Sequence, residues 1–426
     1  MNYLIEELRW RGLIQDMTPG TEEMLSKGMA TGYVGFDPTA DSLHIGNLVP
    51  IMLLVHLQRA GHKPLALVGG ATGLIGDPSG KSSERNLLEP EVIQHNLECQ
   101  KKQLMQFLDF QNGPNQAEIV NNYDWFKGIS FLEFIRDVGK HITVNYMLAK
   151  DSVKNRLENG MSFTEFSYQL IQGYDFYYLF INRNCSLQMG GSDQWGNMVT
   201  GTEIIRRKAA AEAFALTAPL VKKADGTKFG KSEGGNVWLD RSKTSPYKFY
   251  QYWLNVSDED ARNFIRVFTL KSKTEIENLE SEHAVNPHLR ILQKALAEEV
   301  TLRVHSQADL EQAQMASEVL FGKAGLNQLL ELDEQTFLEV FEGIPQVKLA
   351  SEVDMGACTI VELLSEGSSM QIFKSKGEAR RMLEAGGVSI NKVKVQLEDK
   401  PSELSWIKGK YLLVQLGKKN YHLIEK

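Results

Sequence analysis

The stretch that decides the fold reads Ala30-Thr-Gly-Tyr-Val-Gly-Phe36 at its start, a short apolar run that predicts a buried strand. Apolar residues then recur from Ile45 to Ala60, which predicts a helix that stops before Gly61. A second apolar run, Pro64-Leu-Ala-Leu-Val-Gly-Gly70, predicts another strand. Strand, helix and strand at this spacing form a βαβ unit and hence a parallel sheet, whose ligands bind at the carboxyl ends of the strands.

The remaining chain divides by pattern. We expect a first domain at residues 1–246, with a helical insertion at about 90–185. Residues 247–345 are nearly all helical in pattern, and residues 346–357 read as a linker. In residues 358–426, short helices precede the strand-like run Tyr411–Leu416, which predicts a small α+β domain. The predicted fold class is therefore α/β, followed by a helical domain and the α+β domain.

The composition is that of an ordinary globular protein, with 42% hydrophobic and 24% charged residues. No run approaches the roughly 20 apolar residues of a membrane helix, so we expect no membrane contact. Residues 1–11 predict an amphipathic helix and no signal peptide. The three cysteines lie far apart without a Cys-x-x-Cys pair, which predicts neither disulfides nor a metal site and fits the reducing cytoplasm.

The charge is distributed unevenly. The chain carries a net charge of −7, yet residues 370–426 hold 12 Lys and Arg against 6 Asp and Glu. A basic end on an acidic body is typical of a domain that binds a polyanion. A basic domain that is merely soluble has the same charge, so charge alone leaves both interpretations open.

A first motif, Asp37-Pro-Thr-Ala-Asp-Ser-Leu-His44-Ile-Gly46-Asn47, joins the first strand to the helix. Its end lies at the helix N-terminus, where unpaired N–H groups and a positive dipole attract phosphate. Gly46 would let a flat ligand such as adenine approach the backbone, and His44 or Thr39 could donate to a phosphoryl group. The alternative is a polar cap with a glycine for tight packing.

Two further segments could supply phosphate contacts. The glycine-rich stretch at 69–82 does not match a P-loop, because Ile75 stands where that motif needs glycine. It reads instead as a loop from which Lys81 and Arg85 reach phosphates, or as a plain surface loop. A second motif, Lys228-Phe-Gly-Lys231-Ser232, holds two lysines three residues apart that could clamp a departing pyrophosphate. A solvated loop is the alternative.

Together the two motifs resemble the paired signatures of class I aminoacyl-tRNA synthetases, His-Ile-Gly-His and Lys-Met-Ser-Lys-Ser, in their order and separation. The variants found here resemble those of the tyrosine branch. Three more segments resemble that branch, so that the resemblance covers essentially the whole chain: Tyr33–Thr39, Tyr168–Asp175 and Gln188–Asn197. Residues 168, 172 and 175 would also share one helix face, since they are four and three residues apart.

The resemblance implies a Rossmann-like parallel-sheet catalytic domain at 1–246 and a helical anticodon-recognition domain at 247–345. It implies that residues 358–426 form an RNA-binding domain of the kind named for ribosomal small-subunit protein four. The chain would activate L-tyrosine with ATP, accompanied by Mg²⁺, and transfer it to tRNA(Tyr), working as a homodimer. No dedicated metal site is expected.

The resemblance also implies roles for individual residues. Tyrosine would be bound by Tyr33, Asp77, Tyr168, Gln172, Asp175 and Gln194. ATP would be bound by Gly35, Asp37, His44, Gly46, Asn47, Gly191, Asp193 and Lys231. The phosphates would be stabilised during catalysis by Thr39, His44, Lys81, Arg85, Lys228 and Lys231. RNA would be contacted by Arg380, Arg381, Lys392 and Lys394.

Two alternatives stay open at this point. A tryptophan-activating relative shares the first motif but lacks the C-terminal RNA-binding domain, and Tyr33 with Asp175 suits a phenol better than an indole. An RNA-binding protein on a synthetase scaffold, such as a splicing factor, would not need the lysines of the second motif or His44.

Overall fold

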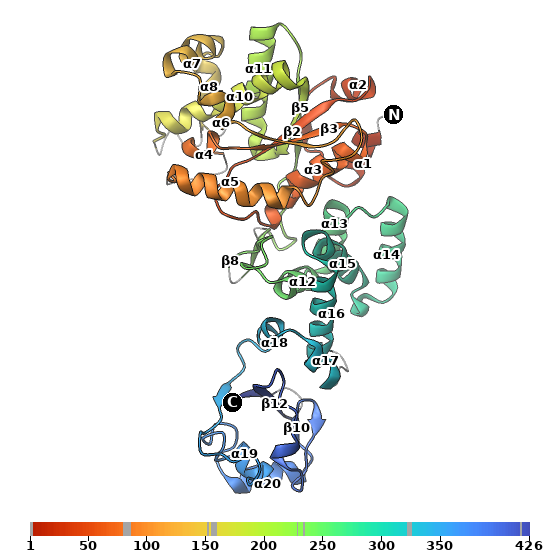
Figure 1. Cartoon of the computed structure of the whole chain (residues 1–426). Helices are drawn as coiled ribbons and strands as arrows, with labels where there is room; N and C mark the ends of the chain where they lie inside the picture. Colours follow the sequence, from red (N-terminus) through yellow and green to blue (C-terminus); the bar gives the residue numbers. More distant parts are fainter. Residues whose placement is uncertain are drawn as a thin grey trace. The chain divides into compact units, whose positions relative to one another are not determined.

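The computed structural model describes residues 3–79, 87–150, 153–154, 160–227, 229–232, 235–321, 326–417 and 420–426. The chain forms two compact units, which Figure 1 shows coloured along the sequence. Unit 1 comprises Met1–Thr244 and Tyr252–Val304, and unit 2 comprises Ser245–Gln251 and His305–Lys426. In the part of the chain that the structure describes, no helix is both long enough and apolar enough to cross a membrane.

Unit 1 is built on a six-stranded sheet with the order β1-β6-β5-β2-β3-β4. All neighbours are parallel except β1, which is antiparallel to β6. The strands are β1 (Asp16–Met17), β2 (Thr31–Phe36), β3 (Lys63–Val68), β4 (Glu118–Asn121), β5 (Cys185–Gly191) and β6 (Phe214–Ala218). The βαβ unit predicted at residues 30–70 is therefore confirmed, and with it the α/β fold class.

Helices cover both faces of this sheet. The alternation of side chains along β2 puts Gly32 against Leu57 of α3 (Leu48–Arg59) and Tyr33 against Phe176 of α10 (Phe163–Arg183). A Cβ on Gly32 would lie 2.9 Å from Leu57 Cδ2, so glycine lets α3 lie close to the strand. The other helices of the sheet region are α1 (Tyr3–Trp10), α2 (Thr21–Ser26), α4 (Thr72–Ile75), α5 (Pro90–Leu104), α6 (Tyr123–Phe126), α7 (Phe131–Asp137), α8 (Val144–Leu148) and α11 (Trp195–Ala209).

The sheet has its topological switch point at β2. The chain leaves β2 toward β3 and β4 on one side and later returns to β5 and β6 on the other. Connections on the two sides diverge there, which opens a crevice at the carboxyl ends of the strands. The first motif begins directly after β2, so the fold puts it at this crevice.

The region at 90–185 is less uniformly helical than the sequence predicted. Strand β4 lies inside it and pairs with β3 as an edge of the parallel sheet. The helical insertion predicted at about 90–185 did not include this strand. The strand has four residues, of which only Val120 is buried, so its periodicity is too short to stand out.

The predicted helical domain at 247–345 is divided between the two units. Helices α13 (Asp258–Phe268), α14 (Lys273–Val285) and α15 (Ile291–Val304) belong to unit 1. Helices α16 (Gln307–Phe321), α17 (Leu326–Glu331) and α18 (Glu334–Val340) belong to unit 2. Helix α12 (Pro246–Leu254) is divided between the units, since its residues up to Gln251 are assigned to unit 2 and those from Tyr252 onward to unit 1.

Unit 2 contains a five-stranded sheet with the order β11-β10-β12-β13-β9. Its strands are β9 (Gln346–Lys348), β10 (Val388–Ile390), β11 (Val393–Lys394), β12 (Tyr411–Leu416) and β13 (Asn420–Glu425). The strand predicted at 411–416 is confirmed. Strand β9 pairs with β13 and therefore belongs to the folded sheet, although it falls at the start of the predicted linker.

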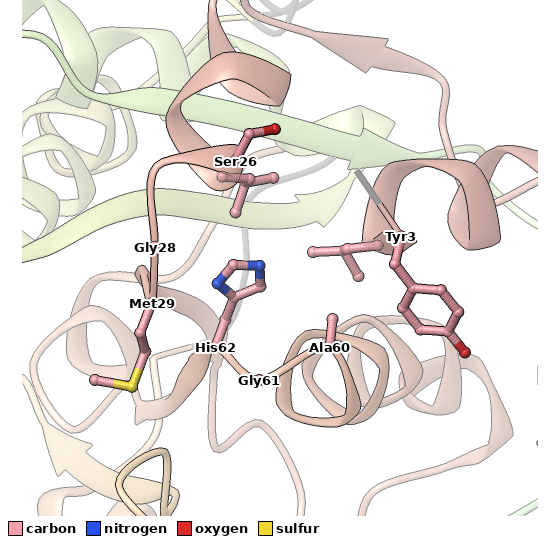
Figure 2. Close-up of a pocket in the computed structure, with 9 residues that line it drawn as sticks. Tyr3, Ser26, Gly28, Met29, Ala60, Gly61 and His62 are labelled. Carbon is pink, nitrogen blue, oxygen red and sulfur yellow. The ribbon is translucent and has the colours of Figure 1, made fainter. Parts of the chain in front are cut away.

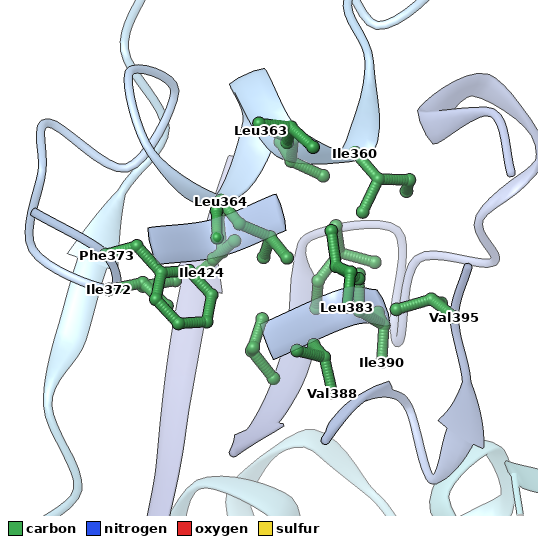
Figure 3. Close-up of a cluster of buried hydrophobic side chains, with 14 of the residues drawn as sticks. Ile360, Leu363, Leu364, Ile372, Phe373, Leu383, Val388, Ile390, Val395 and Ile424 are labelled. Atoms are coloured by element: carbon green, nitrogen blue, oxygen red, sulfur yellow. The ribbon is translucent and has the colours of Figure 1, made fainter. Parts of the chain in front are cut away.

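Two hydrophobic clusters hold unit 2 together. One cluster joins α19 (Ile360–Leu364) and α20 (Lys376–Glu384) to the sheet, and Figure 3 shows Leu363, Leu383, Ile390 and Ile424 among its side chains. The other cluster joins Phe337 of α18 to the side chains of β12 and β13 that point to the opposite face of the sheet. Helices on both faces of one sheet explain why α16–α18 belong with the C-terminal residues and not with the preceding helices.

Candidate active site

A half-buried carboxylate, Asp37, lies directly after β2. Asp37 accepts hydrogen bonds from the Tyr168 hydroxyl (2.9 Å) and from the Thr72 hydroxyl (2.7 Å). A Cβ at Gly69, directly after β3, would overlap both Thr72 Oγ1 and Asp37 Oδ1. The glycine at the end of β3 therefore leaves the space in which these two hydroxyls and the carboxylate meet.

A second carboxylate, Asp175, lies fully buried on α10. The indole N–H of Trp125 donates to its Oδ1 (2.9 Å), and the Asn122 amide donates to its Oδ2 (3.0 Å). Burial raises the pKa of Asp175 to about 8, the two donors act in the opposite direction, and the charge of Asp37 raises the pKa further. The carboxyl group can therefore gain or lose its proton near neutral pH, and a further donor would favour its charged form.

The hydroxyl of Tyr33 has no hydrogen-bond partner among the residues that the structure describes, although Tyr33 is only 1% exposed. Burial raises the pKa of this phenol well above its usual value, and the nearby charge of Asp175 raises it further. Gln172 Oε1, also on α10, is buried without a partner as well. Unpaired buried polar atoms are costly, so their presence beside Asp175 indicates a place prepared for a polar ligand.

A third carboxylate, Asp77, lies at the same edge of the sheet. It accepts from the Gln194 amide (2.6 Å) and from the backbone N–H of Ser79 (2.9 Å). The Asn197 amide links this pair, since it donates to Ser79 Oγ (3.2 Å) and Gln194 Oε1 (3.3 Å). Gln194 and Asp77, which the sequence assigned to one substrate, are thus brought together.

The first motif forms the polar cap that was its alternative interpretation. His44 Nδ1 accepts from the backbone N–H of Gly46 (3.0 Å), and Asn47 Oδ1 accepts from the backbone N–H of His44 (3.0 Å). A Cβ at Gly46 would lie 2.7 Å from His44 Cε1, so glycine is needed for the ring to fold over the backbone. A cap does not exclude phosphate binding, because it orients the ring at the helix N-terminus.

The segment that follows the second motif lies against the first motif. The N–H of Ile45 donates to Val237 O (2.9 Å), and the N–H of Leu239 donates to Leu43 O (2.8 Å). A Cβ built at Gly230 would lie 3.7 Å from the N atom of Gly46. The two motifs, nearly 190 residues apart, therefore meet at the crevice.

The residues predicted to contact the nucleotide lie along β2 and β5 and in the segments that follow these strands. Gly35 is exposed although β2 is a central strand, so the backbone there is open to a ligand. Gly191 ends β5, and a Cβ on it would lie 2.6 Å from Asp193 Oδ1. Asp193 and Thr39 are both exposed beside these strands. Lys81, Arg85 and Lys228 lie outside the described residues, and the backbone of Lys231 begins the short strand β7 (Lys231–Ser232), which pairs with β8 (Gly235–Asn236).

Sequence reasoning missed five residues of this network: Thr72, Ser79, Asn122, Trp125 and Asn197. Asn122 directly follows β4, and polar residues at the carboxyl ends of parallel strands are a usable signal once the strand is known. Trp125 gave no signal, because an indole N–H aimed at a carboxylate is invisible until the fold puts α6 beside α10.

A cavity of about 330 Å³ lies at the amino ends of β2 and β3, away from the carboxylates described above. Figure 2 shows the His62 ring and the side chains of Tyr3 and Met29 around it. None of the carboxylates described above lines this cavity. Among the residues that the structure describes, no group of three or more His, Cys, Asp or Glu could hold a metal ion.

Residues 26–322 match the family described as tRNA synthetases class I (W and Y). Because this match covers more than half of the chain, the protein belongs to that family, and the resemblance seen in the sequence is confirmed. Residues 336–424 match the family described as the Tyrosine--tRNA ligase SYY-like C-terminal domain, which begins earlier than the predicted boundary at 358.

Individual relatives point within the family to tyrosine. The chain is 60% identical over 424 residues to the tyrosine–tRNA ligase of Cytophaga hutchinsonii, covering 100% of this chain and 99% of that protein. It is 59% identical over 430 residues to the tyrosine–tRNA ligase of Bacteroides thetaiotaomicron, with the same coverage. A truncated mitochondrial tyrosyl-tRNA synthetase of Aspergillus nidulans shares 29% identity with a TM-score of 0.68, covering 75% of this chain and 94% of that chain.

Trp125→Phe tests the hydrogen bonds on Asp175. The substitution removes a donor that stabilises the charged carboxylate, so the pKa of Asp175 should rise from about 8 by roughly one to two further units. A carboxyl ¹³C titration of aspartate-labelled protein, assigned with Asp175→Asn, measures this shift. Trp406→Phe in unit 2 is the control, and a pKa that stays the same or falls in Trp125→Phe would contradict the arrangement.

Proposed function

We propose that this chain ligates tyrosine to tRNA in two steps, with ATP as the activating substrate. The observation that carries the proposal is the pairing of buried Asp175 with the unpartnered hydroxyl of Tyr33. A phenol entering there donates to the carboxylate and accepts from the Tyr33 hydroxyl. Phenylalanine would leave both groups unpaired, and an indole is wider than the place that a phenol fills.

The other end of tyrosine meets the remaining polar groups. Its ammonium group is held by Asp77, by the Tyr168 hydroxyl oxygen and by Gln172 Oε1, and Gln194 lies toward its carboxylate. A tyrosine carboxylate oxygen then attacks the α-phosphorus of ATP, and the bond to pyrophosphate breaks. In the second step a terminal ribose hydroxyl of tRNA attacks the carbonyl carbon, and AMP leaves. Positioning and charge stabilisation are sufficient for both steps.

ATP lies along the crevice in this proposal. Exposed Gly35 and the helix N-terminus at Gly46 and Asn47 flank the base, while Gly191 and Asp193 meet the ribose, and Asp37 closes the pocket through its hydrogen bonds. The phosphates face the residues assigned to charge stabilisation, which are Thr39, His44, Lys81, Arg85, Lys228 and Lys231. Mg²⁺ enters bound to the phosphates of ATP and not as a resident metal.

The function is tested by ATP–pyrophosphate exchange with tyrosine, tryptophan and phenylalanine. Tyrosine should support exchange at least about thirtyfold better than phenylalanine, since two buried polar groups left unpaired cost about 1–3 kcal/mol each. Asp175→Ala should lose this preference while ATP affinity stays within a few fold. Exchange with tryptophan alone would favour the tryptophan-activating alternative, and exchange with no amino acid would favour the RNA-binding protein that lacks synthetase activity.

Unit 2 carries the proposed RNA contacts. Arg380 and Arg381 are exposed on α20, and Lys394 is exposed on β11. Lys392 is half-buried and already contacts the Tyr421 hydroxyl (2.9 Å). The exposed arginines are therefore the better phosphate contacts of this set. The residues of the helical segment would contact the anticodon region of the tRNA.

The double substitution Arg380→Ala with Arg381→Ala should weaken tRNA binding about tenfold. It should also lower the slope of log affinity against log salt by about two, because two phosphate contacts are lost. Pyrophosphate exchange should be unchanged. Lys376→Ala is the matched control on the same helix, since Lys376 is held in ion pairs with Glu362 and Glu366. An unchanged salt slope in the double variant would exclude these arginines.

A second copy of the chain is the proposed partner of an apolar surface on unit 1. Helix α7 has no buried residue, and Phe131 and Leu132 on it are 65% and 77% exposed. Exposed apolar side chains gathered on one short helix indicate a protein interface. The chain would form this homodimer in the cytoplasm, where reducing conditions suit its three free cysteines.

Leu132→Asp should convert the dimer to a monomer, because it would bury a charge without a partner. Sedimentation equilibrium measures the mass directly. Val285→Asp is the matched control, since Val285 is 76% exposed on α14 and should leave the mass unchanged. A monomeric wild-type protein at micromolar concentration, or a dimer that survives Leu132→Asp, would contradict this interface.

A further inference from the structure

The second residue of the second motif, Phe229, is buried. Phe229 is 6% exposed, and its ring meets four other rings. It stacks on Phe268 with centroids 5.2 Å apart and planes 12° apart, and it meets Phe264 edge-on at 5.0 Å. Trp253 and Tyr252 complete the set at 5.9 Å and 6.3 Å. These five residues are called the aromatic cluster.

The four rings that surround Phe229 belong to helices that carry no residue assigned to catalysis. Tyr252 and Trp253 lie on α12, and Phe264 and Phe268 lie on α13. Trp253 is fully buried, and Phe264 and Phe268 are each 1% exposed. Ring pairs of this kind add to the stability gained by burial and prefer definite geometries. The cluster therefore holds the Phe229 side chain in one place.

The next residue, Gly230, ties the motif backbone on two sides. Its N–H donates to the Tyr252 hydroxyl (3.4 Å), and its carbonyl oxygen accepts from the N–H of Val237 (3.1 Å). Its φ of +90° is a conformation that glycine adopts readily. A Cβ on it would lie 3.6 Å from Ile45 Cγ1, so the backbone passes close to the first motif.

The contacts continue without a break from the cluster to the helix N-terminus at His44. Val237, which bonds Gly230, accepts at its own carbonyl oxygen from the N–H of Ile45 (2.9 Å). Ile45 is the residue that follows His44. The motif backbone is thus fixed between a packed set of rings on one side and the first motif on the other.

We propose that Phe229 is a positioning residue that sets where the lysines of the second motif lie relative to the phosphates. Lys228 precedes Phe229 by one peptide bond and lies outside the described residues, whereas the described backbone runs from Phe229 through Gly230 to Lys231. A shift of the Phe229 backbone therefore moves the chain that carries these lysines. Misplacing a charge by about 1 Å can cost a hundredfold in rate, even when the change lies outside the reacting groups. This inference rests on the proposed ligase function, because it concerns the rate of adenylate formation.

If Phe229 only positions the lysines, its substitution should change the rate of adenylate formation without changing the affinity for tyrosine. In the proposed site tyrosine meets residues of β2 and α10, whereas the four rings that pack on Phe229 belong to α12 and α13, so tyrosine affinity should not depend on the aromatic cluster. The charge of the two lysines matters most as pyrophosphate departs. Loosening Phe229 should therefore lower the rate of adenylate formation and leave tyrosine bound as before.

The experiment compares three full-length variants in single-turnover adenylate formation. Phe229→Leu loosens the motif, and Phe268→Leu removes its stacking partner from the side of α13. Each should lower the maximal rate at least tenfold while the dissociation constant of tyrosine stays within twofold. The double variant should lose no more than the slower single variant, because the two residues act as one unit.

Ile265→Val is the control for a loss of packing alone, since Ile265 is fully buried on the same helix. It should lower the melting temperature yet keep the rate within twofold of wild type. The proposal is overturned if Phe229→Leu and Phe268→Leu react within twofold of wild type, or if their rate and tyrosine affinity fall together with their melting temperature. Should Phe229→Leu fail to fold, Phe268→Leu alone decides the question. A wild-type protein without tyrosine-dependent exchange would instead refute the ligase function.

Discussion

The burial of a carboxyl group at Asp175 is the constraint on which the rest of the site depends. An unpaired charge in the interior is costly, and two hydrogen-bond donors only partly offset that cost. The pKa of Asp175, about 8, reflects the part of this cost that the two donors do not offset. Unit 1 must therefore hold Asn122, at the end of β4, and Trp125, on α6, against one point of α10.

The packing of α10 on α11 serves the same end. A Cβ at Gly173 would lie 2.8 Å from Ile204 Cδ1, and a Cβ at Gly201 would lie 2.9 Å from Phe176 Cβ. Two glycines on facing helices thus let the helices approach closely. This approach fixes the face of α10 that bears Tyr168 and Asp175 over the carboxyl ends of the strands. The proposed recognition of a phenol therefore relies on this close packing of α10 against α11.

Much of this fold could be predicted from local patterns, and much of the site could not. The βαβ unit and the strand at 411–416 have clear apolar runs, and the spacing of 168, 172 and 175 is correct for the helix that the structure shows. Short β4 has too few residues for a periodic signal, and without it neither Asn122 nor Trp125 could be linked to Asp175. The helices at 247–345 were predicted to form one domain, because helical periodicity does not indicate which part of the fold each helix packs against.

The two signature motifs illustrate the same limit. Each is weak as a sequence pattern, and even in the structure His44 and Asn47 form an ordinary helix cap. They are distinguished by their proximity in the fold. Backbone hydrogen bonds join residues 43–45 of the first motif to residues 237–239, which follow the second motif. The buried ring of Phe229 adds a contact that neither motif reveals alone, because its four partners come from helices later in the chain.

The central claim is that Tyr33 and Asp175 recognise a phenol. The most direct test is a crystal structure of the full chain with L-tyrosine bound. We expect a phenolic oxygen within about 2.5–3.0 Å of both the Tyr33 hydroxyl and an Asp175 carboxylate oxygen, the range of an O–H···O hydrogen bond. A tyrosine that binds with its phenol directed away from these two groups, or that occupies the cavity before β2 and β3, would contradict it.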